Sequence, residues 1–275
     1  MNSHSRNSGE FDPSSSVPAI TLRDVAKTFG SFLAIDQMSF EVAPRRFVSL
    51  VGPSGCGKST LLNMLAGLSG PSAGVIEIFG DRLSGLNRRA AYMFQRDALL
   101  PWKTVLGNVQ LGLQLRGHPR EEAGERAHEW VRRIGLEGFA RHYPNQLSGG
   151  MRKRVAMAQC WIIEPDLVLM DEPFSALDVH TRFRMETEIL GLWSTSNTTV
   201  VFVTHDLEEA IALSDEVLLL SAAPRTRVVA AYPIDLLRPR ELMDIKSDSY
   251  FQDIHRTIWH DLRTEVLKVD DRIRV

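Results

Sequence analysis

Short apolar runs of strand length recur along the chain, and each is followed by polar residues. Such runs are typical of strands that are buried on both faces of a sheet. They are Phe47–Val51, Leu167–Met170 and Thr199–Val203. Alternation at Met38, Phe40 and Val42 predicts strands within residues 20–42, and Val75–Phe79 is a further strand candidate. The pattern predicts an α/β fold in which an antiparallel sheet flanks the core.

Helical spacing follows the first run and also fills the middle of the chain. Apolar residues after Val51 recur at a helical interval, at Leu61, Leu62, Leu65 and Leu68. Residues 104–165 are predicted to be mostly helical, and they include an amphipathic run from Glu121 to Ile134 that begins just after Pro119. Helices between strands favour a parallel sheet whose carboxyl ends bind a ligand.

Composition narrows the class of protein. The 275 residues are 44% hydrophobic and 24% charged, which is ordinary for a globular protein, and the net charge of −2 gives no basic footprint for nucleic acid. The longest apolar runs, such as Val217–Leu220, are far shorter than the ~20 residues that span a bilayer. Residues 1–18 have no apolar stretch of a secretory signal and are expected to be disordered. The two cysteines, Cys56 and Cys160, fit a reducing cytosol, and Cys160 is expected in the core.

A phosphate-binding loop of the form G-x-x-x-x-G-K-[ST] lies between the first apolar run and its helix. Its residues are Gly52, Pro53, Ser54, Gly55, Cys56, Gly57, Lys58, Ser59 and Thr60. Backbone N–H groups of such a loop and the following helix N-terminus bind phosphate oxygens. Lys58 is predicted to reach the β- and γ-phosphates and the Ser59 hydroxyl to bind Mg²⁺. The strand–loop–helix context therefore predicts a nucleoside triphosphate site.

A second candidate is a pair of carboxylates, Asp171 and Glu172, that closes the strand Leu167–Met170. Neighbouring side chains on an extended segment point apart, so the two acids can take different roles. We expect Asp171 to hold Mg²⁺ and Glu172 to polarise the attacking water.

The segment Leu147–Met151 reads LSGGM and begins a predicted helix. Ser148 is a candidate N-cap, and apolar residues recur after it at helical spacing, at Met151, Val155, Ala158 and Ile162. Basic residues occupy 152–154, in the first turn, where the helix dipole favours acids. Two explanations stay open: a solvated cluster of charges, or an anion that docks on this N-terminus.

These motifs in this order resemble the ATP-binding cassette (ABC) family, with its signature LSGG, the Walker B sequence LVLMDEP and the D-loop SALD. The resemblance runs from about Thr21 to about Leu220. It implies a P-loop NTPase fold with a RecA-like core, an N-terminal antiparallel β subdomain and a helical subdomain at about 96–165. We expect the ATPase domain to cover 19–235 and a C-terminal helical extension to cover 236–275.

The resemblance assigns further residues. Phe29 matches the aromatic residue that stacks on adenine, although a hairpin phenylalanine packed on the core is the alternative. Gln95 matches the Q-loop glutamine, which reaches Mg²⁺ and the water, and His205 matches the switch histidine that contacts the γ-phosphate. Asp178 matches the D-loop carboxylate that meets a partner subunit. Met151 and the sequence Gln159–Trp161 depart from the usual signature helix without touching this set.

The resemblance also implies assembly and cofactors. Two cassettes sandwich two ATP molecules with Mg²⁺, each held by the phosphate loop of one chain and by Ser148, Gly149 and Gly150 of the other. On this reading the basic helix start has the γ-phosphate as its anion. Glu172 is the general base, with charge stabilisation from Lys58 and Mg²⁺.

The chain is further identified as similar to importer ATPases of the nitrate, sulfonate and taurine group. That likeness rests on Gln95–Trp102, on 104–109, and on a tail with Arg238-Pro239-Arg240 and a helix bearing Phe251, Ile254, Ile258, Leu262 and Val266. It implies a location on the cytoplasmic face of the cell membrane and a separate integral-membrane permease that docks near Gln95–Trp102, with a solute-binding protein as an indirect partner. We expect Trp102 to line the docking groove, with burial in the helical subdomain's own core as the alternative. A non-transport ABC ATPase, of the DNA-maintenance or translation type, remains the other functional class.

Overall fold

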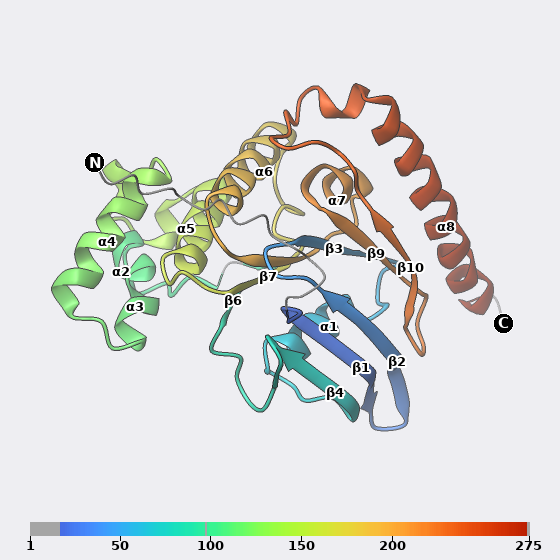
Figure 1. Cartoon of the computed structure of the whole chain (residues 1–275). Coiled ribbons are helices and arrows are strands. Elements are labelled where there is room, and N and C mark those ends of the chain that lie inside the picture. Colours follow the sequence, from blue (N-terminus) through green and yellow to red (C-terminus); the bar gives the residue numbers. More distant parts are fainter. Residues whose placement is uncertain (1–16, 97, 274–275) are drawn as a thin grey trace, which may run out of the picture.

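A six-stranded, mostly parallel sheet forms the centre of the molecule (Figure 1). The computed structural model describes residues 17–96 and 98–273, so the predicted disordered head lies outside the described residues except for 17 and 18. Its strands, in the order β10-β9-β3-β8-β7-β6, run parallel except for β10. They are β3 (Phe47–Val51), β6 (Ala90–Met93), β7 (Leu167–Asp171), β8 (Thr199–Val203), β9 (Glu216–Leu220) and β10 (Val228–Pro233).

The predicted apolar runs are continuous because the strands are covered on both faces. In β3, Phe47 and Val51 join one core cluster, whereas Val48 and Leu50 join the other. Successive side chains of a strand point to opposite faces, and β7 and β8 alternate in the same way. The three strands predicted from these runs are therefore confirmed, and β7 extends one residue further than predicted, to Asp171.

The predicted antiparallel sheet covers one face of the central sheet. Its order is β2-β1-β4-β5, and its strands are β1 (Ile20–Phe29), β2 (Phe32–Val42), β4 (Ala73–Ile78) and β5 (Asp81–Arg82). Helix α1 (Lys58–Leu65) packs between the two sheets through its leucines. The strand predicted at Val75–Phe79 begins two residues earlier and ends at Ile78, because Phe79 has a φ of 50° and starts the turn into Gly80.

Helices cover the opposite face. The group predicted within residues 104–165 projects from one end of the central sheet (Figure 1). It comprises α2 (Val105–Val109), α3 (Leu111–Leu115), α4 (Arg120–Arg133), α5 (Gly149–Trp161) and the short 3₁₀ turns Glu137–Phe139 and Pro144–Gln146. Helices α6 (Val179–Ser194) and α7 (Leu207–Leu213) join the same core cluster. Cys160 lies in this core, as predicted.

Sequence reasoning missed two strands of the central sheet, together with the two-residue strand β5 of the antiparallel sheet. Strand β6 reads AAYM and β10 reads VVAAYP, and both are short or rich in alanine, so neither shows a strong hydrophobic period. They are the two edge strands of the sheet, where β6 pairs with β7 and β10 pairs with β9. Their neighbours, rather than their own propensity, make them strands.

The C-terminal extension returns to the sheet edge beside β10 and ends in the long helix α8 (Ser249–Ile273), preceded by a 3₁₀ turn at Ile245–Ser247 (Figure 1). The helix expected to bear the five apolar residues is present, with Phe251, Ile258 and Leu262 buried, Ile254 half-buried and Val266 39% exposed. The helix still contacts the rest of the chain at this point, because the buried Glu265 accepts from the N–H of Ala222 at 3.0 Å.

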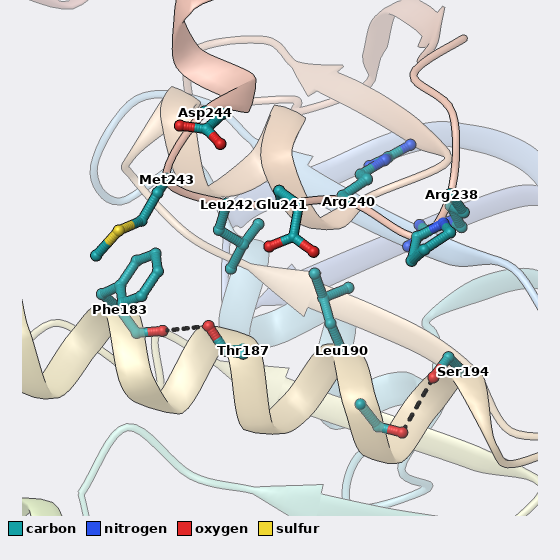
Figure 2. Close-up of a pocket in the computed structure, with 12 residues that line it drawn as sticks. Phe183, Thr187, Leu190, Ser194, Arg238, Arg240, Glu241, Leu242, Met243 and Asp244 are labelled. Carbon is teal, nitrogen blue, oxygen red and sulfur yellow. Dashed lines mark hydrogen bonds between the residues drawn. The ribbon is translucent and has the colours of Figure 1, made fainter.

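The first part of the extension is anchored to the C-terminal end of α7. Arg240 is buried and donates to the carbonyl oxygens of Ile211, Ala212 and Ser214. Figure 2 shows residues 238–244 above α6, where Leu190 and Leu242 point toward one another across a cavity of about 590 Å³. None of the predicted nucleotide-site residues lines this cavity.

Candidate active site

The phosphate loop and the predicted catalytic residues lie together at the carboxyl ends of the parallel strands of the central sheet. Strands β3, β8, β7 and β6 are adjacent and parallel, so their carboxyl ends meet. The phosphate loop follows β3, Asp171 ends β7, and His205 and Gln95 each come two residues after β8 and β6. Four segments that are far apart in the sequence thus supply one site.

The phosphate loop wraps around the ammonium of Lys58. Gly57 caps α1 with a φ of 99°, a conformation that favours glycine, and the helix begins at Lys58. The Nζ atom of Lys58 is buried and donates to the carbonyl oxygens of Gly52 at 2.8 Å and Pro53 at 3.0 Å. The first N–H groups of any helix have no intrahelical partner. A buried cation beside such donors fits a phosphate ligand.

The remaining loop residues differ in exposure. Ser54, Gly55 and Ser59 are exposed, Thr60 is half-buried in α1, and Cys56 is buried. Burial raises the pKa of the Cys56 thiol, although the ammonium of Lys58 opposes that shift. The thiol is therefore protonated at neutral pH and packs as a small apolar side chain.

The two acidic residues at the end of β7 face different neighbours, as the sequence predicted. A carboxylate oxygen of Asp171 accepts from the hydroxyl of Tyr92 at 3.4 Å, and Asp171 also hydrogen-bonds the side chain of Ser59. Burial, together with the charge of Glu172, raises the pKa of Asp171 against the opposing hydrogen bond from Ser59. A buried carboxylate beside a hydroxyl is a set of oxygen donors that fits Mg²⁺.

Glu172 is turned toward the other two predicted catalytic residues. Its Oε2 atom accepts from Nε2 of Gln95 at 3.1 Å and lies 3.3 Å from Nδ1 of His205. Glu172 has a φ of 44°, and its N–H donates to the carbonyl of Val203 at 2.9 Å. Glu172 therefore lies just beyond the strand in a left-handed conformation, so the extended segment from which its separation from Asp171 was predicted ends at Asp171.

Two residues of this region were missed by sequence reasoning. Tyr92, on β6, holds Asp171 through its hydroxyl, and its position three residues before Gln95 is a signal that could have been used. Lys153, on α5, is buried and donates to the carbonyl oxygens of Gln95 at 2.6 Å and Phe94 at 3.4 Å. The signature helix is therefore tied directly to the Q-loop.

Phe29 lies at the end of β1, beside the turn into β2, and is 53% exposed. The alternative in which this side chain packs on the core is therefore wrong. Its ring lies 5.3 Å from the ammonium of Lys27, and Phe32 across the turn is also exposed. An open aromatic face of this kind is available for stacking on a base.

The signature segment has the predicted N-cap, because Ser148 accepts from the N–H of Met151 at 3.3 Å. The explanations offered for the basic first turn need correction. Arg152 donates to the carbonyl of Leu147 at 2.7 Å, Lys153 is buried on the Q-loop, and Arg154 pairs with Glu188 at 2.8 Å. These cations have partners within the chain, so they neither form a solvated cluster nor require a docked anion.

The D-loop residue Asp178 begins α6 as its N-cap, accepting from the N–H of Thr181 at 3.0 Å. These hydrogen bonds lower the pKa of its carboxyl group. Thr181 also lies against the signature segment, since a Cβ on Gly150 would meet Thr181 Cγ2 at 2.6 Å. The signature segment therefore lies against the first turn of α6, the helix that Asp178 caps.

Comparison with known proteins agrees with this geometry. The family model described as ABC transporter matches residues 35–175. The chain is 44% identical over 235 residues to an uncharacterized ABC transporter ATP-binding protein, MJ0412, of Methanocaldococcus jannaschii, covering 86% of both chains. It is also 42% identical over 229 residues to the taurine import ATP-binding protein TauB of Rhizobium johnstonii, covering 82% of this chain and 87% of that protein.

Solved structures give the same result. A structure described as the dimeric structure of MJ0796, a bacterial ABC transporter cassette, superimposes with a TM-score of 0.71 at 32% identity. The match covers 79% of this chain and 100% of that one. A second structure of the same cassette, described as a post-hydrolysis dimer bound to ADP and phosphate, gives a TM-score of 0.69 at 31% identity.

Proposed function

We propose that this chain, which belongs to the ABC transporter family, is the ATP-hydrolysing subunit of an importer for a small solute. Its fold is that of the ABC cassette, and it uses ATP and Mg²⁺. The observation that carries the hydrolytic proposal is the approach of Gln95 and His205 to one carboxylate oxygen of Glu172, beside the phosphate loop. We assign Glu172 as the general base.

The roles of the other residues follow from where they lie. The ammonium of Lys58 exchanges its two carbonyl contacts for phosphate oxygens and orients them. His205 and Gln95 hold the carboxylate of Glu172 in place to accept a proton from the attacking water. Bound Mg²⁺, held by Ser59, Asp171 and Gln95, supplies charge neutralisation at the phosphates. The exposed ring of Phe29 stacks on adenine.

A second cassette completes the site. Ser148, Gly149 and Gly150 bind the nucleotide of the partner chain, and Asp178 meets the partner near that nucleotide. The proximity of Gly150 to Thr181 supports this, because it places the signature segment beside the first turn of α6, which directly follows the D-loop. The dimeric arrangement of the similar cassette supports the same assembly.

A permease docks beside the Q-loop on this proposal. Trp102 is 71% exposed, so the alternative in which it covers the helical group's own core is wrong. The segment that carries it is nevertheless fixed: the buried Asn108 accepts from the N–H of Leu100 at 2.8 Å and donates to the carbonyl oxygens of Leu100 and Lys103. An exposed aromatic side chain on a fixed segment is the kind of anchor that fills a partner's pocket.

The transport class is favoured by the relatives named for taurine import. We propose a solute of that kind, a sulfonate, nitrate or similar small anion, and a peripheral location on the cytoplasmic face of the membrane. Among the described residues, no helix is both long and apolar enough to cross a bilayer. The proposal assigns the permease to a separate chain.

The experiment is Trp102→Ala, co-expressed with the cognate permease. We expect recovery of the cassette with membranes to fall while the melting temperature and basal ATPase activity are kept. Leu115→Ala is the matched control, since Leu115 is an exposed apolar side chain (79%) of the same helical group. Normal membrane recovery of the Trp102 variant would reject docking at this site without affecting the assignment of Glu172.

A further inference from the structure

The backbone next to His205 is fixed by the buried hydroxyl group of Thr204. Thr204 immediately precedes the histidine, and its Oγ1 atom accepts from the N–H of Asp206 at 3.0 Å. The same hydroxyl donates to Oε2 of Glu209, on α7, at 2.6 Å. Thr204 and Glu209 are both buried, whereas the His205 side chain is 62% exposed. The histidine therefore projects from a loop whose two flanking residues are fixed.

A guanidinium on α6 reaches the same loop. Arg182 lies 3.4 Å from Oδ2 of Asp206, and its Nε atom lies 3.6 Å from Oε1 of Glu209. The other end of the guanidinium donates to the carbonyl oxygen of Leu177 at 3.3 Å. Leu177 directly precedes Asp178, so one side chain contacts both the D-loop and the loop that carries His205.

We propose that Thr204, Glu209 and Arg182 are positioning residues for ATP hydrolysis, which fix His205 against Glu172 and tie both to the D-loop. This inference rests on the proposed roles of His205 and Glu172. Neither Glu209 nor Arg182 was singled out by the sequence motifs, because both belong to helices that follow the motif residues.

A backbone hydrogen bond explains how the loop at Thr204 can affect the distance between His205 and Glu172. The N–H of Glu172 donates to the carbonyl of Val203, the residue just before Thr204. A shift of the loop at Thr204 therefore changes the distance between Nδ1 of His205 and the Glu172 carboxylate, which is 3.3 Å in this structure. Displacement of a reacting group by about 1 Å costs up to roughly 10²-fold in rate. If the partner cassette displaces the D-loop, Arg182 would transmit that displacement to the loop that carries His205.

The test is the pair Thr204→Val and Thr204→Ser. Valine keeps the branched shape and removes the hydroxyl, whereas serine keeps the hydroxyl. We expect Thr204→Val to lower kcat roughly 10-fold with KM for ATP almost unchanged, and Thr204→Ser to restore most of the rate. Thr198→Val is the matched control, because Thr198 is buried directly before β8, the strand that Thr204 directly follows, and donates to the carbonyl of Pro165.

A double-mutant cycle separates positioning from a merely structural role. In a His205→Ala background, we expect Thr204→Val and Arg182→Gln each to change kcat by less than about 2-fold, since residues that act as a unit are not additive. Phosphate release from the purified full-length chain, measured with radiolabelled ATP, is sensitive enough for the slow variants.

Three results would overturn the inference. Equal losses from Thr204→Val in both backgrounds would show that the hydroxyl does not act through His205. A normal kcat with a lowered melting temperature, as expected for Thr198→Val, would make Thr204 a structural residue only. Parental kcat in His205→Ala itself would instead reject the proposed role of the histidine, and this is visible before any Thr204 variant is made.

Discussion

Nδ1 of His205 lies 3.3 Å from Oε2 of Glu172. The contact follows from the sheet, because β7 and β8 are adjacent parallel strands and Asp171 pairs with Val203 in their register. Glu172 lies one residue beyond Asp171, and His205 lies two residues beyond Val203. Both side chains therefore lie at the carboxyl ends of these two strands. The glutamate is therefore oriented by residues of this chain.

Removal of the Lys58 ammonium should weaken nucleotide binding. Lys58 is buried inside the phosphate loop, where charge-assisted hydrogen bonds contribute about 1.5–3 kcal/mol each. We expect Lys58→Ala to raise the Kd for ATP by at least roughly 10-fold. Titration with a fluorescent ATP analogue measures this change, and circular dichroism checks the fold. An unchanged Kd would contradict the placement of Lys58 at the phosphates.

The stability of the chain should depend on pH through Glu209. Burial raises the pKa of Glu209 to about 7 from an ordinary 4.5, with Asp206 and Glu186 acting in the same direction, and the hydrogen bond from Thr204 and the charge of Arg182 opposing. The unfolded chain thus loses this proton first, and the contribution of Glu209 to stability falls as pH rises from about 4.5 to about 7.

Glu209→Gln removes that titration. We expect the free energy of unfolding of the variant, relative to the parent, to rise by up to about 3 kcal/mol across the same interval and to level off above it. Urea denaturation at a series of pH values measures the difference. A difference that stays flat between pH 4.5 and 7 would contradict the raised pKa.

The strongest sequence signals proved to be the hydrophobic runs and the glycine-containing motifs. Phe47–Val51 is apolar throughout because both faces of the central sheet are covered, and a motif such as LSGG fixes a local backbone form. The missed strands β6 and β10 lie at the ends of the sheet, where pairing with a neighbour decides the structure.

Contacts between distant residues could not be predicted from local patterns. The basic residues after Ser148 suggested an anion, yet Lys153 reaches carbonyl oxygens 58 and 59 positions away in the chain. Trp102 could have been buried or exposed, because an aromatic residue after proline fits both. Arg182 contacts Leu177 in a nearby loop and Asp206 in a distant one, and only the packing of α6 beside α7 brings these together.

ATP should bring two chains together when hydrolysis is blocked. Because we propose that the signature residues act on the partner's nucleotide, we expect Glu172→Gln to be monomeric without ATP and dimeric with Mg²⁺ and ATP. Light scattering after size exclusion measures the mass. The double variant Lys58→Ala, Glu172→Gln is the control and should stay monomeric. A Glu172→Gln chain that binds ATP yet remains monomeric at high concentration would argue against the shared site.

The most direct measurement is ATP turnover by purified Glu172→Gln, with the Kd for ATP determined in parallel. Glutamine keeps the shape and can still contact Gln95 and His205, but it cannot accept the proton of the attacking water. We predict that turnover falls by roughly 10²–10⁴-fold while ATP binding is kept. Near-parental hydrolysis in this variant would contradict the assignment of Glu172 as the general base.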